Sequence, residues 1–251
     1  RMELVGDLLA RDRRSRDTAL VTADGRERSH HDLITNGYKA ANVLRYLGVR
    51  EGATVAVDPT PGFHTTLAFL GAAAVGAPVR FDPAAGIDAG DRVVLAPVAT
   101  AAGLDPAPGT NLAAFGGPPE RPETTHWEQE LWSENPGTPP SDVGTDDDAV
   151  IGPKRAYTHR ELCSVATTVA EEAGLDGETR VVLRCPFSDA AAVAAGLLAP
   201  LSVGGTAVLA ALDRTSNETD EPRGDVAVAP GDATVPEPRR IDPASTALSA
   251  E

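Results

Sequence analysis

The sequence predicts an α/β protein made of two related units, each a largely parallel β-sheet flanked by helices. Three observations favour this class. Short apolar segments typical of buried strands alternate with longer segments of helical periodicity, as in proteins with parallel sheets. The order of these segments in the first half of the chain recurs in the second half. Proline or glycine follows most of the segments, as the turns between strands and helices require.

The first unit is predicted over residues 1–117. A short amphipathic helix and a charged turn precede two strands, which a hairpin turn at Asp24-Gly25 connects. Ser29 begins a long helix, because apolar residues then recur at helical spacing until Gly48 ends it. The following helix is apolar on most sides and is therefore expected to be buried. The strands are predicted at 18–22, 27–29, 55–57, 79–81 and 92–96, and the other two helices at 2–10 and 65–75.

Residues 118–148 differ in composition and are predicted to be a surface connector. Pro, Gly and Thr are frequent, and the segment ends in the acidic run 141–148. Trp127 and Trp132 stand in a short stretch of helical spacing, 126–133. Since aromatic pairs usually serve packing, we expect the two tryptophans to anchor this connector on a domain.

The second unit is predicted over 149–235 and repeats the first in the same order, with 236–251 as a flexible tail. A strand at 149–151 and a Gly-Pro turn lead to a helix that Thr158 begins as N-cap, with Glu161 three residues on. Residues 213–223 and 231–251 are rich in Pro, Asp and Thr and are expected to be loop or tail. The matching segments are 157–162 with 29–33, 173–175 with 47–49, 180–183 with 54–57, 190–198 with 65–75, 204–208 with 76–79 and 224–230 with 90–97.

The charge balance excludes nucleic acid as a partner. The net charge is -15, and Lys39 and Lys154 are the only lysines, so that no basic face is available to neutralise phosphates. An Asp-rich, Lys-poor composition is typical of proteins from salt-accumulating archaea, and low salt is expected to loosen such a fold.

The sequence further predicts a cytoplasmic protein without a membrane segment. Cys163 and Cys185 lie in apolar surroundings without CxxC spacing, as small buried side chains in a reducing compartment do. The N-terminal residues show no secretory signal, because the apolar residues 8–10 run directly into charged ones. The most apolar stretch, 190–212, contains Pro200 and three glycines and is predicted as helix, turn and strand.

Two blocks of sequence resemble a known family. The segments 32–57 and 70–79 resemble the N-terminal part of AMP-forming acyl-CoA synthetases and their adenylate-forming relatives. Pro153-Lys154, Thr158-His159 and the segment 186–209 resemble the region around that family's phosphate loop. The resemblance covers about residues 3–82 and 127–210, and it implies two Rossmann-like units of the family's large N-terminal domain.

The chain departs from this family where the chemistry would lie. A Ser-Gly-Thr-Thr-Gly-like run is expected before the Pro-Lys pair, but here 149–151 pass directly to Gly152, and Arg155 replaces the glycine after the lysine. Ser188-Asp189 stand where the family usually has an aromatic-His pair. The sequence also ends before the family's adenine-binding stretch, Mg-binding Glu and C-terminal lid with its catalytic lysine. The resemblance therefore implies about half of such an enzyme.

The candidate site residues follow from this resemblance. For phosphate or nucleotide binding they are Gly152, Lys154, Arg155, Thr158 and His159, and for a substrate pocket Ser188 and Asp189. The alternative for the first group is a solvated turn, since single basic residues near turns are common.

No catalytic residue or metal site is predicted. His30-His31 hold the position equivalent to His159 in the first repeat, which favours a structural role for both and leaves a metal without further ligands. The sequence contains no Gly-x-Ser-x-Gly, no Cys-His pair at a recognised spacing and no GxGxxG after a strand.

The leading hypothesis is a shortened acyl-CoA synthetase-like protein that is inactive alone and acts as a binding or regulatory protein beside a full-length synthetase. The alternative is one half of a split acyl-adenylate-forming ligase that a partner chain completes, and a third reading is a decaying gene product. ATP or AMP with Mg is expected only if the altered loop still binds nucleotide. Uncovered apolar surface on the second unit predicts a homo-oligomer or another protein partner.

Overall fold

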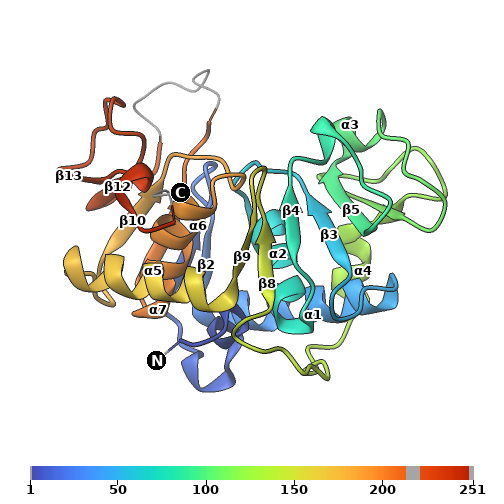
Figure 1. Cartoon of the computed structure of the whole chain (residues 1–251), viewed down its shortest axis with the longest axis horizontal. Helices are drawn as coiled ribbons and strands as arrows, with labels where there is room; N and C mark the ends of the chain where they lie inside the picture. Colours follow the sequence, from blue (N-terminus) through green and yellow to red (C-terminus); the bar gives the residue numbers. More distant parts are fainter. Residues whose placement is uncertain (1, 213–220, 249–251) are drawn as a thin grey trace.

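Two β-sheets enclose a layer of helices (Figure 1). The computed structural model describes residues 2–212 and 221–248. Sheet A has the strand order β13-β12-β10-β11-β1-β2 and sheet B the order β7-β6-β5-β3-β4-β8-β9. All neighbours are parallel except the hairpins β1–β2 and β8–β9. The strands are β1 (Thr18–Val21), β2 (Glu27–Ser29), β3 (Thr54–Val57), β4 (Val79–Phe81), β5 (Asp91–Pro97), β6 (Asn111–Phe115), β7 (Thr125–His126), β8 (Asp148–Ile151), β9 (Ala156–Thr158), β10 (Arg180–Leu183), β11 (Thr206–Leu209), β12 (Val226–Val228) and β13 (Arg239–Ile241).

The two longest helices begin where the sequence supplies N-cap side chains. Ser29 and Thr158 each form a capping box with the acidic residue three positions later, Asp32 and Glu161. A π-helical turn precedes Pro200, whose ring nitrogen cannot donate an intrahelical hydrogen bond. The helices are α1 (His30–Tyr46), α2 (Phe63–Val75), α3 (Val98–Ala101), α4 (Trp127–Ser133), α5 (His159–Glu172), α6 (Ala190–Val193), the π-turn Ala194–Leu198 and α7 (Ala199–Ser202), with short 3₁₀ helices at Val5–Leu9, Arg11–Arg13, Pro83–Ala85 and Pro243–Ser245.

The predicted repeat is present, but its two hairpins are exchanged between the sheets. In sheet B the order β5-β3-β4 continues into β8-β9, and in sheet A the order β12-β10-β11 continues into β1-β2. Each hairpin therefore completes the sheet formed mostly by the other half of the chain. The α/β class with largely parallel sheets is confirmed, while the sequence boundary at 118–148 does not coincide with the division between the sheets.

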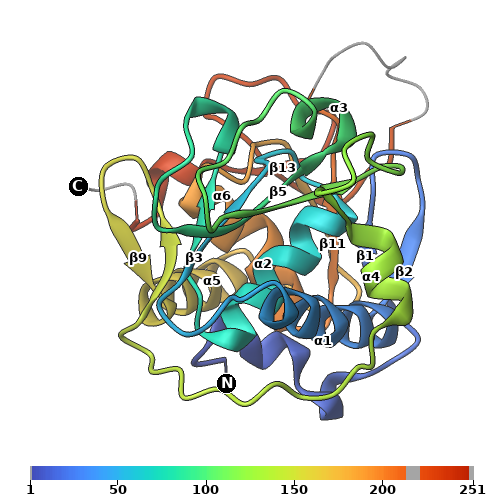
Figure 2. The same ribbon diagram turned by 90° about the vertical axis from the view of Figure 1, so that its right-hand side faces the viewer.

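The helices between the sheets share one hydrophobic core. A single cluster of buried side chains joins both sheets with α1, α2, α5 and the continuous helix 190–202. Helices α1 and α2 lie side by side (Figure 2). They approach closely at Gly71, where a Cβ atom would lie 2.7 Å from the backbone nitrogen of Ala41. The core is thus packed through small residues, which explains why few aromatic side chains suffice.

Two local expectations for the segment after β5 were wrong. Trp127 is fully buried, but Trp132 is 88% exposed, because α4 presents only one face to α1 and β6. The stretch after β5, which was assigned no strand, contains β6, an interior strand of sheet B.

The predicted flexible tail is ordered over its described part: β13 pairs in parallel with β12, and Leu248 is buried. Its polar, arginine-rich sequence concealed an edge strand of three residues. Residues 213–220 of the predicted loop lie outside the described residues. Within the described chain, no helix combines the length and the apolar character that crossing a membrane needs.

Candidate functional site

The turn that connects β8 to β9 spans only residues 152–155. The Gly152 N–H donates to the Arg155 carbonyl oxygen at 2.9 Å, which closes the hairpin directly. A Cβ atom on residue 152 would lie 2.8 Å from the Tyr157 ring and 3.1 Å from the Arg155 carbonyl oxygen. A side chain at position 152 would have to displace the Tyr157 ring, so the close packing of the turn favours glycine.

The Arg155 side chain is engaged within this hairpin. Its guanidinium lies 4.1 Å from the centre of the Tyr157 ring and donates to Glu161 Oε1 at 2.8 Å. Partial burial raises the pKa of Glu161. The hydrogen bonds from Thr158 and Arg155 together outweigh this effect, so the pKa of Glu161 lies below its ordinary value. Arg155 is thus an internal partner of the capping box.

Thr158 and His159 also serve the fold. The Thr158 hydroxyl accepts the Glu161 N–H at 3.2 Å, and the Thr158 N–H donates to Glu161 Oε2 at 2.8 Å. His159 is fully buried, and its Nδ1 accepts the Val5 N–H at 3.2 Å, which assigns the proton of the neutral ring to Nε2. Burial lowers the pKa of His159.

His30, the counterpart of His159 in the first repeat, is buried as well. Its Nε2 lies 3.1 Å from the Gly204 carbonyl oxygen, in the loop before β11. Burial also lowers the pKa of His30. Both histidines therefore join the first turn of a helix to a distant segment, as a structural role requires.

Lys154 differs from the other candidates of this group. It is exposed, and among the described residues its ammonium group has no hydrogen bond or ion pair. Of the two cationic side chains proposed for phosphate binding, Arg155 is bonded to its neighbours and Lys154 is not.

The substrate-pocket candidates lie on the other sheet, after β10. Asp189 caps the helix 190–202, because its Oδ1 accepts the N–H groups of Ala191 and Ala192 at 3.0 and 3.1 Å. Ser188 is half-buried beside it. The preceding Phe187 N–H donates to the Pro59 carbonyl oxygen at 2.8 Å, so the segments that follow β10 and β3 meet. The carboxyl ends of strands from both sheets thus come together here, where α/β proteins commonly bind ligands.

Sequence reasoning missed a buried ion pair at the same end of sheet A. Arg184, directly after β10, donates to both carboxylate oxygens of Glu237 at 2.8 and 3.1 Å and to Glu221 at 3.2 Å. Arg184 lines a cavity of about 500 Å³. A polar residue directly after a buried strand was the available signal, but the partner Glu237 lies in the stretch assigned to the tail.

A second missed feature is Asp82, directly after β4. It is the non-glycine residue with positive φ, 71°, within the described chain. Such a conformation is unusual outside glycine and marks the end of β4 as a conformationally special position.

No group of three or more His, Cys, Asp or Glu side chains in the described part of the chain is placed to hold a metal ion. Cys163 and Cys185 are free and buried, and burial raises the pKa of each thiol to about 12. Such a pKa keeps each thiol in its protonated form at neutral pH.

Comparison with known proteins gives the fold a name. No protein-family model matches the sequence, and no curated protein matches it. Among solved structures, a benzoate CoA ligase from Burkholderia xenovorans LB400 is similar with a TM-score of 0.72 at 21% identity, over 90% of this chain and 50% of the ligase. The chain has the fold of the N-terminal part of AMP-forming acyl-CoA ligases.

Other ligases of this fold match over the same extent. An anthranilate CoA ligase solved with anthranoyl-AMP gives a TM-score of 0.72 at 17% identity, over 90% of this chain and 49% of that one. ATP-bound MatB from Rhodopseudomonas palustris gives 0.70 at 17%, over 91% and 49%. The chain spans about half the length of these acyl-CoA ligases, and at such identities the likeness establishes the fold.

Proposed function

We propose that this chain is a non-catalytic binding or regulatory protein built on the fold of the acyl-CoA ligase N-terminal part. The observation that carries the proposal is the β8–β9 turn. The resemblance implies a phosphate loop rich in glycine and hydroxyl groups before Lys154, and the four residues 152–155 take its place.

The groups that remain at the turn are mostly engaged with one another. Holding a triphosphate takes several converging N–H and hydroxyl donors. Here the Gly152 N–H bonds to the Arg155 carbonyl, the Arg155 guanidinium to Glu161, and the Thr158 hydroxyl to the Glu161 N–H. The Lys154 ammonium group remains available to a phosphate. A single exposed ammonium group contributes about 0–1 kcal/mol to an ion pair. With the other groups engaged, the turn offers fewer converging donors than a triphosphate site uses.

An activity assay tests the proposal. The purified chain is incubated in molar KCl with ATP, Mg²⁺ and a panel of aryl and short-chain carboxylic acids, and ATP–pyrophosphate exchange is measured. We expect exchange at the level of a blank without protein. Acid-dependent exchange by the chain alone, reduced in Lys154→Ala and unchanged in the matched control Lys39→Ala, would contradict the proposal.

The second candidate is one half of a split adenylate-forming ligase. One observation favours it: Lys154 is exposed without a partner among the described residues. A partner chain would then supply the remaining nucleotide contacts, the Mg²⁺ ligand and the lid. Exchange that appears only when a co-purifying chain is added, and that needs Lys154, would favour this candidate over the regulatory role.

A further inference from the structure

Helix α5 and strand β13 flank a cavity of about 790 Å³, which we call the α5–β13 cavity. Strand β13 is the edge strand of sheet A (Figure 1). Sites for small organic molecules commonly have volumes of about 300–1,000 Å³, so this cavity is large enough to hold one.

One side of the α5–β13 cavity is apolar. Val165 and Val169 line it from α5, Val226 from β12 and Ile241 from β13. The two valines of α5 stand four residues apart and therefore lie on one face of the helix. All four side chains are buried or half-buried. An apolar group that covers this side of the cavity is removed from water, which favours its binding.

A guanidinium group lies at the same cavity. Arg239 Nη1 donates to the carbonyl oxygen of Ala173 at 2.7 Å, and both residues line the cavity. Because Ala173 is the C-cap of α5, this bond holds the Arg239 side chain between β13 and the helix. Among the described residues it is the guanidinium's only hydrogen bond, so the other N–H groups are available to a ligand. A guanidinium pairs best with a planar or branched anionic head group that offers two oxygens.

The charge around the cavity is balanced, unlike that of the chain. The whole chain carries -15, whereas the charged side chains that line the cavity are Arg239, Arg240, Glu172 and Asp242. Asp242 Oδ1 is already engaged, because it accepts the N–H of Ala244 at 3.0 Å. An anion therefore meets less repulsion here than at the acidic surface as a whole.

Two hydroxyl groups add possible donors on the helix side. Ser164 and Thr168 line the cavity and are exposed. They stand four residues apart, on the face of α5 next to that of Val165 and Val169. Within the described chain neither hydroxyl makes a hydrogen bond. The cavity thus combines an apolar side with a polar side that carries a guanidinium.

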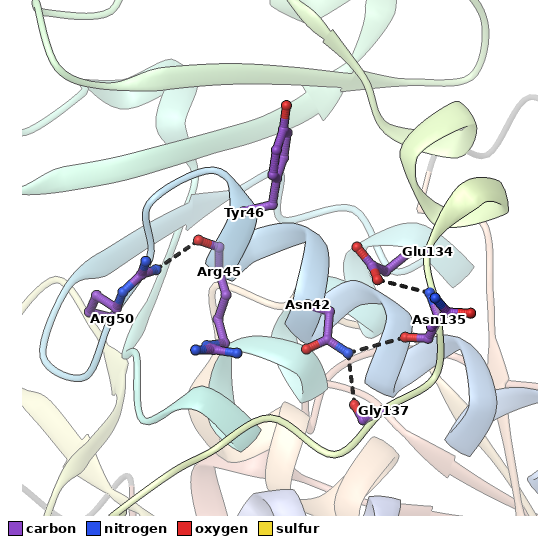
Figure 3. Close-up of a pocket in the computed structure, with 7 residues that line it drawn as sticks. All are labelled: Asn42, Arg45, Tyr46, Arg50, Glu134, Asn135 and Gly137. Carbon is purple, nitrogen blue, oxygen red and sulfur yellow. Dashed lines mark hydrogen bonds between the residues drawn. The ribbon is translucent and has the colours of Figure 1, made fainter.

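The cavity at the end of α1 lacks this combination (Figure 3). It is smaller, about 370 Å³, and no aliphatic side chain lines it. Its polar groups are also engaged within the protein: Asn42 Nδ2 donates to the carbonyl oxygens of Asn135 and Gly137 at 3.1 and 2.7 Å. Arg50 donates to the Arg45 carbonyl oxygen at 2.7 Å.

We propose that the α5–β13 cavity binds a small amphipathic anion. Its anionic head group pairs with the Arg239 guanidinium, and its apolar body covers Val165 and Val169 of α5. None of the residues that line the cavity belongs to the β8–β9 turn, so this proposal does not rest on the proposed function.

Fluorescence titration with anilinonaphthalene sulfonate, an apolar aromatic body with one sulfonate, tests the site in molar NaCl. We expect saturable binding of one probe molecule per chain. Arg239→Gln should raise the Kd by about tenfold or more, because it removes a charged hydrogen-bond donor. The matched control Arg26→Gln, in the exposed β1–β2 turn, should leave the Kd unchanged. The absence of saturable binding, or an equal Kd for Arg239→Gln, would overturn the proposal.

A second variant tests the cavity without touching β13. Thr168→Trp places a large side chain in the cavity from an exposed helix position and should also weaken probe binding by about tenfold or more. The matched control His31→Trp, at an exposed position of the equivalent helix α1, should bind the probe as the wild type does. Circular dichroism checks that each variant is folded. A folded Thr168→Trp variant with the wild-type Kd would contradict the assigned site.

Competition against the probe tests the class of ligand. Octanesulfonate should displace it at a concentration at least about tenfold below that of octanol or octyltrimethylammonium, because the three share an apolar body and differ in charge. Equal displacement by all three, or stronger displacement by the cation, would overturn the assignment of an anion. Co-sedimentation with phosphatidylglycerol vesicles tests a membrane surface as the source of the head group. We expect none, since the chain is acidic, and co-sedimentation that Arg239→Gln abolishes would overturn the proposal of a free small molecule.

Discussion

Replacing Trp127 with alanine measures how firmly the connector is held to the core. Trp127 is fully buried at the start of α4, between α1 and β6. A tryptophan side chain buries up to about 250 Å², which at about 25 cal/mol per Å² gives an upper bound of about 6 kcal/mol. Its indole N–H has no hydrogen-bond partner among the described residues, which offsets about 1–3 kcal/mol. We therefore expect Trp127→Ala to lower the free energy of unfolding by about 3–5 kcal/mol.

Trp132 provides a matched control within the same helix. It is 88% exposed, so Trp132→Ala should change the free energy of unfolding by less than about 0.5 kcal/mol. Urea unfolding of both variants, followed by circular dichroism in molar KCl at a concentration where the chain is monomeric, gives the comparison. Equal losses of stability, or a loss at Trp127 below about 1 kcal/mol, would refute the reasoning.

Three further predictions concern the stability of the fold and use the same unfolding measurement. Burial lowers the pKa values of His30, His64 and His159, so the unfolded chain binds more protons and stability should fall as the pH drops below about 6.5; a flat profile between pH 7.5 and 5 would contradict this. Thr158→Ala removes a capping box and should cost about 1 kcal/mol, as should its counterpart Ser29→Ala; no loss in either would count against the assigned caps. Gly71→Ala should cost about 1–3 kcal/mol despite better helix propensity, because its Cβ would lie 2.7 Å from the Ala41 nitrogen; a stabilised variant would disprove this close approach.

Local structure followed the sequence closely. The capping boxes of α1 and α5, the buried helix α2 and strands such as β3 and β10 lie within a residue or two of their predicted positions. These elements depend on near neighbours in the sequence, namely periodic apolar residues and cap side chains. The order of elements in the repeat was predictable for the same reason.

The exchange of hairpins between the sheets was not predictable from one sequence. Pairing of β1 with β11 and of β4 with β8 joins segments far apart in the chain. The residues of a single strand do not specify which other strand it pairs with. Strand β13 was not predicted, because the sequence of a three-residue edge strand containing Arg239 and Arg240 resembles that of a polar loop.

The sequence predicted where the candidate site lies in the chain, but not which contacts its residues make. The residues at 152–159 lie at one hairpin, but their engagement with Glu161 and Val5 depends on packing that spacing does not reveal. The Arg184–Glu237 pair was missed because its partners lie on segments 53 residues apart in sequence.

Calorimetric titration of the chain with ATP and with AMP, in molar KCl with Mg²⁺, tests the central claim about the β8–β9 turn most directly. Lys154→Ala is the test variant and Lys39→Ala the matched control, since these are the two lysines of the chain. Because the Gly152 N–H, the Arg155 guanidinium and the Thr158 hydroxyl are already engaged, the account predicts no measurable heat of binding with either nucleotide. Micromolar binding that Lys154→Ala weakens and Lys39→Ala preserves would contradict that account and make the split ligase the better explanation.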